Sequence, residues 1–92
     1  VSVILSSENK KQLFIPRGFA HGFVVLSDEA VFSYKVDSPY NFESEGGLAF
    51  NDLELNINWV LKEENLQLSK KDLCNPILKE AYTFDYNKNY YE

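Results

Sequence analysis

Short runs of alternating hydrophobic and polar residues dominate the first two-thirds of the chain, and turn-forming residues separate them. The runs are Val1–Leu5, Gln12–Ile15, Phe19–Leu26, Ala30–Val36 and Leu48–Phe50. The breaks between them are Ser6–Lys11, Pro16–Gly18, Ser27–Glu29 and Ser38–Gly47. Short strands with turns at this spacing are typical of antiparallel sandwiches and barrels. The pattern therefore predicts a mainly β fold.

Two of these runs indicate which side chains face inward. Both alternating faces of Phe19–Leu26 are apolar, so we expect this strand to be buried on both sides. In Ala30–Val36 the alternation puts Tyr34 on the same face as Phe32 and away from Lys35. Tyr34 is therefore predicted to point inward, where its hydroxyl needs a hydrogen-bond partner or a chemical role.

The pattern changes after Trp59. Ser69 with Asp72 three residues later is typical of a capped helix start, and Pro76 ahead of Ile77–Ala81 predicts a second short helical turn.

We expect a single partial domain over residues 1–92, with the strands in 1–60 and a helical segment and tail in 61–92. The tail, Tyr82–Glu92, shows no periodicity and is expected either to pack as an arm or to fray.

Composition narrows the classes of protein that the chain can belong to. The chain has 92 residues, of which 45% are hydrophobic and 15% aromatic, so it is too apolar for a disordered region but short for a self-sufficient core. A net charge of -5 gives no footprint for nucleic acid or for an anionic membrane. No apolar run approaches the roughly 20 residues that span a bilayer, and no signal peptide is evident. We expect a soluble, cytoplasmic protein.

The segment Pro16–His21 has the P-x-G-x-x-H spacing of the second cupin motif, in which a tight turn leads into a strand that carries the His. Metal-dependent cupins combine several imidazoles with a carboxylate, but His21 is the one His of this chain. We therefore expect no metal and no cofactor, and a hydrogen-bonded structural His is the alternative. Cys74 has no second Cys to pair with and is interpreted as a reduced structural residue.

The longer stretch Ser7–Phe23 resembles the S-x-E-N-x-x-Q-L-W/Y-I-P-x-G-F-A-H-G-F signature of the dTDP-4-dehydrorhamnose 3,5-epimerase family. Further family segments follow in order, at Phe32–Lys35, Tyr40, Glu43–Gly46, Asn51–Asp52, Ile57–Trp59 and Leu68–Asp72. The resemblance runs from about Val1 to Leu78 and implies the C-terminal half of a cupin-type jelly roll, with short C-terminal helical segments. Arg17 departs from the Glu frequent in the family, and the tail beyond Glu80 has no counterpart.

The resemblance implies a reaction that removes the protons at C3 and C5 of a dTDP-linked 4-keto-6-deoxy sugar and returns them on the opposite face. Such chemistry needs a base, an acid and support for the enolate oxygen. Tyr34 matches the family's acid, with a structural core Tyr as the alternative. Asp72 matches the carboxylate that orients the family's catalytic His, and it can also serve as a helix-capping residue.

Four further residues match positions that contact the substrate. Tyr40 matches the aromatic that stacks on the thymine ring, and its alternative is a surface Tyr after Pro39. Glu45 and Lys71 match contacts to the nucleotide diphosphate or its sugar, and solvated surface charges are the alternative. His21 matches a substrate-contacting His and not the base.

The R-G-x-H-x-Q segment that carries the family's base does not occur in these residues, nor does the Lys that supports the enolate. We therefore expect the 92 residues alone to be inactive, and to act as a homodimer or with a missing N-terminal half. Two alternatives stay open. One is a non-catalytic nucleotide-sugar binder, and the other is a cupin remnant that dimerises through its open strand edges.

Overall fold

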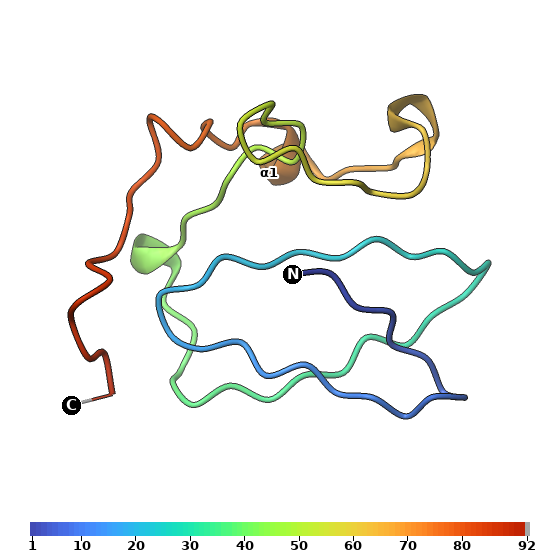
Figure 1. The fold of residues 1–92 in the computed structure, drawn as a ribbon, viewed down its shortest axis with the longest axis horizontal. Helices are drawn as coiled ribbons and strands as arrows, with labels where there is room; N and C mark the ends of the chain where they lie inside the picture. The colour runs from blue at the N-terminus through green and yellow to red at the C-terminus, as the bar shows by residue number, and fades with distance from the viewer. Residues whose placement is uncertain (92) are drawn as a thin grey trace. The chain divides into compact units, whose positions relative to one another are not determined.

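A computed structural model describes residues 1–91 and contains three short helical elements (Figure 1). They are the 3₁₀ helices η1 (Phe42–Ser44) and η2 (Glu63–Asn65) and the helix α1 (Lys70–Leu73). The rest of the described chain runs as extended segments joined by turns. No strand is assigned within residues 1–91, so the partial jelly roll stays a prediction.

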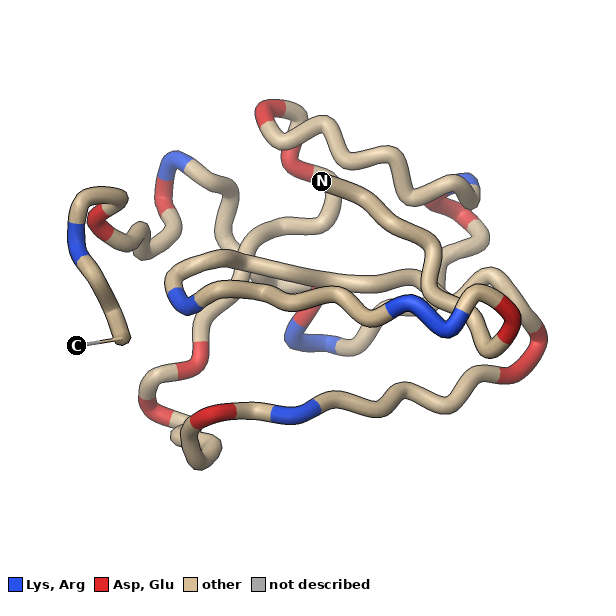
Figure 2. Tube along the Cα trace, turned by 60° about the horizontal axis from the view of Figure 1, so that its bottom comes forward, with Lys and Arg blue, Asp and Glu red and all other residues tan. Residues whose placement is uncertain are grey.

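The chain forms two compact units. The terminal unit comprises Val1–His21 and Phe84–Glu92, of which Glu92 lies outside the described residues, and the central unit comprises Gly22–Thr83. The sequence predicted a single partial domain in which strands give way to helical structure near residue 60. That division concerned the type of secondary structure, and it too stays a prediction. Figure 2 shows acidic and basic residues spread along the described trace, with the basic residues in short, separate stretches. None of the helices in residues 1–91 is long and apolar enough to span a bilayer.

The turns of the terminal unit lie where the sequence predicts them. Lys10 N donates to Ser6 O at 3.0 Å, and the Asn9 side chain accepts from Ser6 N at 3.0 Å. Phe19 N donates to Pro16 O at 3.3 Å across a turn in which Gly18 has φ of 85°. Glycine suits the third position of such a turn because it has no Cβ to strain the left-handed backbone.

In the central unit, aromatic residues on either side of the Ser27–Glu29 break stack on one another. The rings of Phe23 and Phe32 stack with centroids 4.3 Å apart, and the ring of Tyr34 lies 5.3 Å from that of Phe32. Phe32 and Tyr34 thus share a side, as the alternation predicts. The name aromatic strip is used below for Phe23, Phe32 and Tyr34.

The burial expected for these segments is not found. Tyr34 is 71% exposed, and Phe19, Phe23 and Leu26 are each at least half exposed. Alternation decides to which side a side chain points, whereas burial requires a second layer over that side. The described residues supply no such layer over the aromatic strip.

Two stretches of the central unit, 45–52 and 71–78, lie side by side and run in the same direction; they are called the paired segments below. Ala49 N donates to Pro76 O at 2.8 Å, and Leu78 N donates to Asp52 Oδ2 at 2.6 Å. Ala49 and Asp52 are the most buried residues of the described chain, each 8% exposed.

The Asp52 carboxylate joins the second paired segment, 71–78, to the turn that follows Asp52 in the sequence. Besides the Leu78 N–H it accepts from Glu54 N at 2.8 Å, and Leu55 N–H also donates to it. These bonds, the one from Leu78 foremost, hold the pKa of Asp52 below its ordinary value. The stabilisation is therefore present above the ordinary carboxyl pKa and is lost as the pH falls through the lowered one.

Both predicted helical turns near the C-terminus are confirmed. Ser69 is the N-cap of α1, and its Oγ accepts from Asp72 N at 3.2 Å. Ala81 N donates to Ile77 O at 3.0 Å, which closes one helical turn after Pro76. Cys74 ends α1 and is exposed.

The close approach of the paired segments predicts different effects of alanine at two adjacent glycines. A Cβ on Gly47 would lie 2.6 Å from Asn75 Oδ1, whereas a Cβ on Gly46 meets nothing within 4 Å. We expect Gly47→Ala to lower the free energy of unfolding by about 1 kcal/mol, the smaller end of overpacking costs, because the Asn75 carboxamide has to move. Urea unfolding monitored by Trp59 fluorescence measures the change.

Gly46→Ala is the matched control, and it should be neutral or raise stability by about 0.4–1 kcal/mol through the unfolded chain. Adding Asn75→Ala to Gly47→Ala should restore the loss. Equal effects of the two glycine substitutions would contradict the observed pairing.

Candidate functional site

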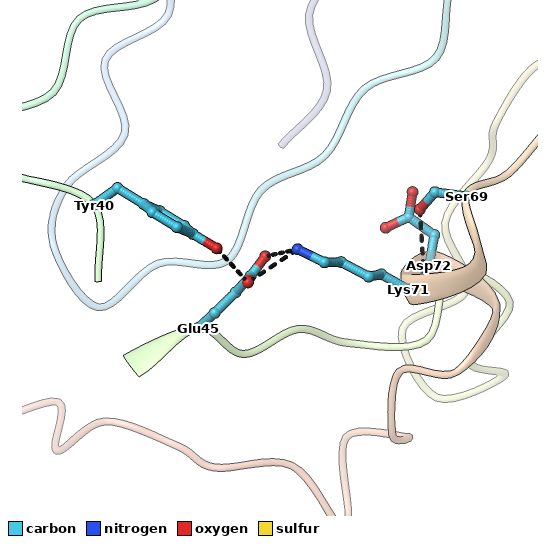
Figure 3. A network of polar contacts seen from close by, with 5 residues as sticks. All are labelled: Tyr40, Glu45, Ser69, Lys71 and Asp72. Carbon is cyan, nitrogen blue, oxygen red and sulfur yellow. Dashed lines mark hydrogen bonds and ion pairs between the residues drawn. The ribbon is translucent and has the colours of Figure 1, made fainter. Parts of the chain in front are cut away.

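Three of the residues predicted to bind substrate meet in the central unit (Figure 3). The Tyr40 hydroxyl donates to Glu45 Oε2 at 2.7 Å, and Lys71 Nζ donates to Glu45 Oε1 and Oε2 at 2.8 and 3.0 Å. The Glu45 carboxylate thus lies between a phenol and an ammonium group. Tyr40, Glu45 and Lys71 are called the polar trio below.

Local backbone geometry brings Tyr40 and Glu45 together. The Asn41 side chain caps η1 by accepting from Glu43 N at 3.1 Å, and Glu45 N closes the turn by donating to Phe42 O at 3.2 Å. This single 3₁₀ turn shortens the path between Tyr40 and Glu45, and their side chains, five residues apart, meet.

Lys71 reaches the trio from a distant part of the sequence. It lies on α1, whose start is fixed by the Ser69 cap, and the paired segments bring its ammonium group within reach of Glu45, the C-cap of η1. The same parallel course that joins Ala49 to Pro76 therefore aligns Glu45 with Lys71.

The three groups shift one another's pKa values. The hydrogen bond from Lys71, followed by that from Tyr40, holds the pKa of Glu45 below its ordinary value. Donation to the Glu45 carboxylate raises the pKa of Tyr40, and the same carboxylate raises the pKa of Lys71. The ionised acid, the neutral phenol and the ammonium form are therefore favoured together.

The trio offers a ring, a cation and an acceptor at the surface. Tyr40 is 73% exposed, and the side chains of Lys71 and Glu45 are 63% and 36% exposed. An open tyrosine ring can stack on a planar heterocycle, and an ammonium group with three donors suits a phosphate as a point charge. In the described part of the chain, no group of three or more His, Cys, Asp or Glu side chains is placed to hold a metal.

The other three predicted residues lie outside this contact. Asp72 follows Lys71 on α1, where its backbone N–H donates to Ser69 Oγ and its charge contributes to the raised pKa of Lys71 (Figure 3). Tyr34 belongs to the aromatic strip, and among the described residues no hydrogen bond or ion pair joins it to the trio. His21 is exposed and ends the first stretch of the terminal unit.

The sequence analysis assigned no role to the residues that hold the backbone of the site in place. Asp52 and Gly47 fix the paired segments, but the residues they contact, Leu78 and Asn75, are more than 20 positions away. The one local signal is the Gly46-Gly47 pair, which is typical of a turn or of a close backbone approach.

The contacts of the polar trio predict that removing the charge of Glu45 changes the pKa values of both other members. In Glu45→Gln we expect the pKa of the Tyr40 phenol and that of the Lys71 ammonium group both to fall toward their ordinary values, because the carboxylate that favours both protonated forms is gone. In the unaltered chain the trio persists through neutral pH. It is lost as the pH falls through the lowered Glu45 pKa, or rises through the raised Tyr40 and Lys71 values.

Carbon-13 NMR of the Tyr ζ and Lys ε carbons, followed against pH, measures both values. Glu43→Gln is the matched control, since Glu43 lies in η1 two residues away and only its backbone N–H takes part in the cap. Unchanged Tyr40 and Lys71 titrations in Glu45→Gln would contradict the trio.

A model of the dTDP-4-dehydrorhamnose 3,5-epimerase family matches residues 1–80. Three relatives, each named dTDP-4-dehydrorhamnose 3,5-epimerase, come from Salmonella typhimurium, Escherichia coli and Pseudomonas aeruginosa. They are 48%, 51% and 53% identical to this chain over 81, 72 and 80 residues, which cover 88%, 78% and 87% of it. No solved structure matches significantly.

The chain spans 44%, 38% and 44% of the lengths of these relatives, which is less than half of each. The matched region contains all six predicted site residues and ends before the tail. A family match over most of the chain, together with identities near one half, confirms the resemblance noted in the sequence. The chain belongs to the dTDP-4-dehydrorhamnose 3,5-epimerase family.

Proposed function

We propose that this chain is the C-terminal part of a nucleotide-sugar 3,5-epimerase. The proposed substrate is dTDP-4-keto-6-deoxyglucose, in which the enzyme inverts C3 and C5 during deoxysugar biosynthesis of the dTDP-rhamnose type. The observation that carries the proposal is the contact among Tyr40, Glu45 and Lys71. The family resemblance matches these three residues to positions that contact the nucleotide. They come from distant parts of the sequence, and in the structure they contact one another.

The polar trio has the groups that a thymidine diphosphate requires. The exposed Tyr40 ring is a stacking surface for the base, and its hydroxyl is held by Glu45, which limits rotation of the ring. Lys71 supplies positive charge for the diphosphate. Because Glu45 pairs with Lys71 in the free chain, the diphosphate has to share or displace that carboxylate.

The reaction centre is proposed at Tyr34 and Asp72. The C4 ketone acidifies the protons at C3 and C5, so a base on one face of the sugar and an acid on the other can invert each centre when the enolate oxygen is supported. Tyr34 is the proposed acid, since a phenol is neutral and able to donate at physiological pH. Asp72 is proposed to orient a histidine base that these 92 residues do not contain, and His21 to contact the substrate.

The exposed apolar surface supports a partner for this chain. The aromatic strip and, within Phe19–Leu26, Phe19, Val25 and Leu26 are exposed, although apolar area of this kind is normally covered. A second copy, or an N-terminal half that completes a jelly roll, is the proposed cover.

Nucleotide binding by the chain itself is the first test. Titration calorimetry should show dTDP binding to the chain, and Tyr40→Ala should weaken it roughly five- to 100-fold, the range for loss of one base–aromatic stack. Tyr86→Ala, which removes a tyrosine that is 95% exposed and outside the family match, is the control and should bind like the parent chain. Equal binding by the two variants would contradict the role of Tyr40.

Epimerisation is the second test, in a chimaera that carries the N-terminal part of the Salmonella typhimurium relative ahead of Val1. In D₂O we expect deuterium to enter C3 and C5 of the keto sugar, as followed by NMR. Tyr34→Phe should slow product formation by roughly 10²–10⁴-fold through loss of the acid. Tyr86→Phe, the matched control, should not change the rate. A folded chimaera that incorporates no deuterium would contradict the proposed reaction.

A second candidate function is supported by the same contact. The polar trio forms within the described residues without any other chain. The second candidate is therefore a protein that binds a nucleotide sugar but lacks the catalytic base. Binding of dTDP combined with an inactive chimaera would favour this function over the epimerase.

A further inference from the structure

Residues 84–91 of the tail pack as an arm against the turn of the P-x-G-x-x-H motif in the terminal unit, which is one of the two outcomes expected for the tail. Arg17 N donates to the Tyr91 hydroxyl at 2.9 Å, and Arg17 Nη1 donates to Tyr90 O at 2.7 Å. The Arg17 guanidinium also lies 4.9 Å from the centre of the Tyr91 ring. One residue of the turn is thus bound through its backbone, its side-chain donors and its charge.

The tail is also braced against the turn by its own aromatic residues. Phe84 lies against Gly18, where an added Cβ would be 3.5 Å from Phe84 Cβ. The rings of Phe84 and Tyr90 meet edge to face with centroids 5.3 Å apart, and the Tyr90 hydroxyl accepts from Asp85 N at 2.8 Å. The tail therefore presents Tyr90 and Tyr91 from a folded segment.

The turn that the tail holds leads directly to His21. Phe19 N closes the turn on Pro16 O, and His21 follows two residues later on the same backbone segment. A rotation of the turn about Gly18, whose φ is 85°, would redirect the backbone that leads to His21. Fixing Arg17 therefore holds the backbone that leads into His21.

We propose that residues 84–91 act as a clamp on the Pro16–Phe19 turn, with Arg17 and Tyr91 as positioning residues for His21. The consequence for ligand binding rests on the proposed function, in which His21 contacts the nucleotide sugar. The clamp lies beyond residue 80, where the match to the family model ends. It also gives Arg17 a structural role.

The ring of His21 can be observed directly because it is the single His of the chain. Its ε1 proton therefore gives one imidazole resonance in the NMR spectrum of the whole chain. We expect this resonance to shift and broaden in Tyr91→Phe, which removes the acceptor of the Arg17 N–H, and more strongly in a chain that ends at Thr83. In Tyr86→Phe, which makes the same chemical change at an exposed position of the tail, it should stay in place.

Trp59 fluorescence, from the central unit, checks that each variant is folded. A merely structural tail would lower the melting temperature without moving the His21 resonance of the folded chain. Arg17→Lys should give an intermediate shift, since it keeps the backbone N–H and the charge but loses the Nη1 donor to Tyr90 O. An unmoved His21 resonance in both Tyr91→Phe and the chain ending at Thr83 overturns the clamp.

Calorimetry with dTDP then separates the clamp from the proposed function. If both hold, Tyr91→Phe should weaken dTDP binding roughly two- to tenfold, the range for one hydrogen bond, and Tyr86→Phe should not. A moved His21 resonance in a chain that binds no dTDP supports the clamp and contradicts the proposed function. An unmoved resonance overturns the clamp whatever the affinity for dTDP.

Discussion

The hydrogen bond from Leu78 N to the Asp52 carboxylate is the interaction on which the central unit depends. It fastens two stretches of chain that lie 26 residues apart in the sequence, at one of the most buried positions of the described chain. The bond from Ala49 N to Pro76 O and the contact of Gly47 with Asn75 extend the same alignment toward α1. Lys71 lies within reach of Glu45 because this alignment continues to the start of the paired segments.

The contacts of the candidate site consequently serve to position its side chains more than to stabilise the fold. Its ion pair is exposed, and water screens such pairs strongly, so the contact between Glu45 and Lys71 adds little to stability. Its value lies in holding a ring, an acceptor and a cation in one place before a ligand arrives. Glu45 keeps the Tyr40 ring in position and at the same time competes with an incoming phosphate for Lys71.

The same sequence leaves most of its apolar side chains uncovered. With 45% hydrophobic residues the chain has the composition of a folded domain, yet Tyr34, Phe32 and Phe23 are exposed in the described residues. Hydrophobic burial needs two faces, and the side chains of a single extended layer cannot bury one another. The terminal unit covers its turn with the tail, and there aromatic rings and one arginine make the contact.

The sequence by itself determined the features whose causes are local. The turn at Gly18, the Ser69 cap of α1 and the shared side of Phe32 and Tyr34 depend on residues within a few positions of each other, and the family was evident from motifs of that length. Only the tertiary structure decided that Lys71 meets Glu45 across 26 residues and that Tyr91 meets Arg17 across 74. Contacts of that separation depend on where whole segments pack, and neither alternation nor capping carries that information.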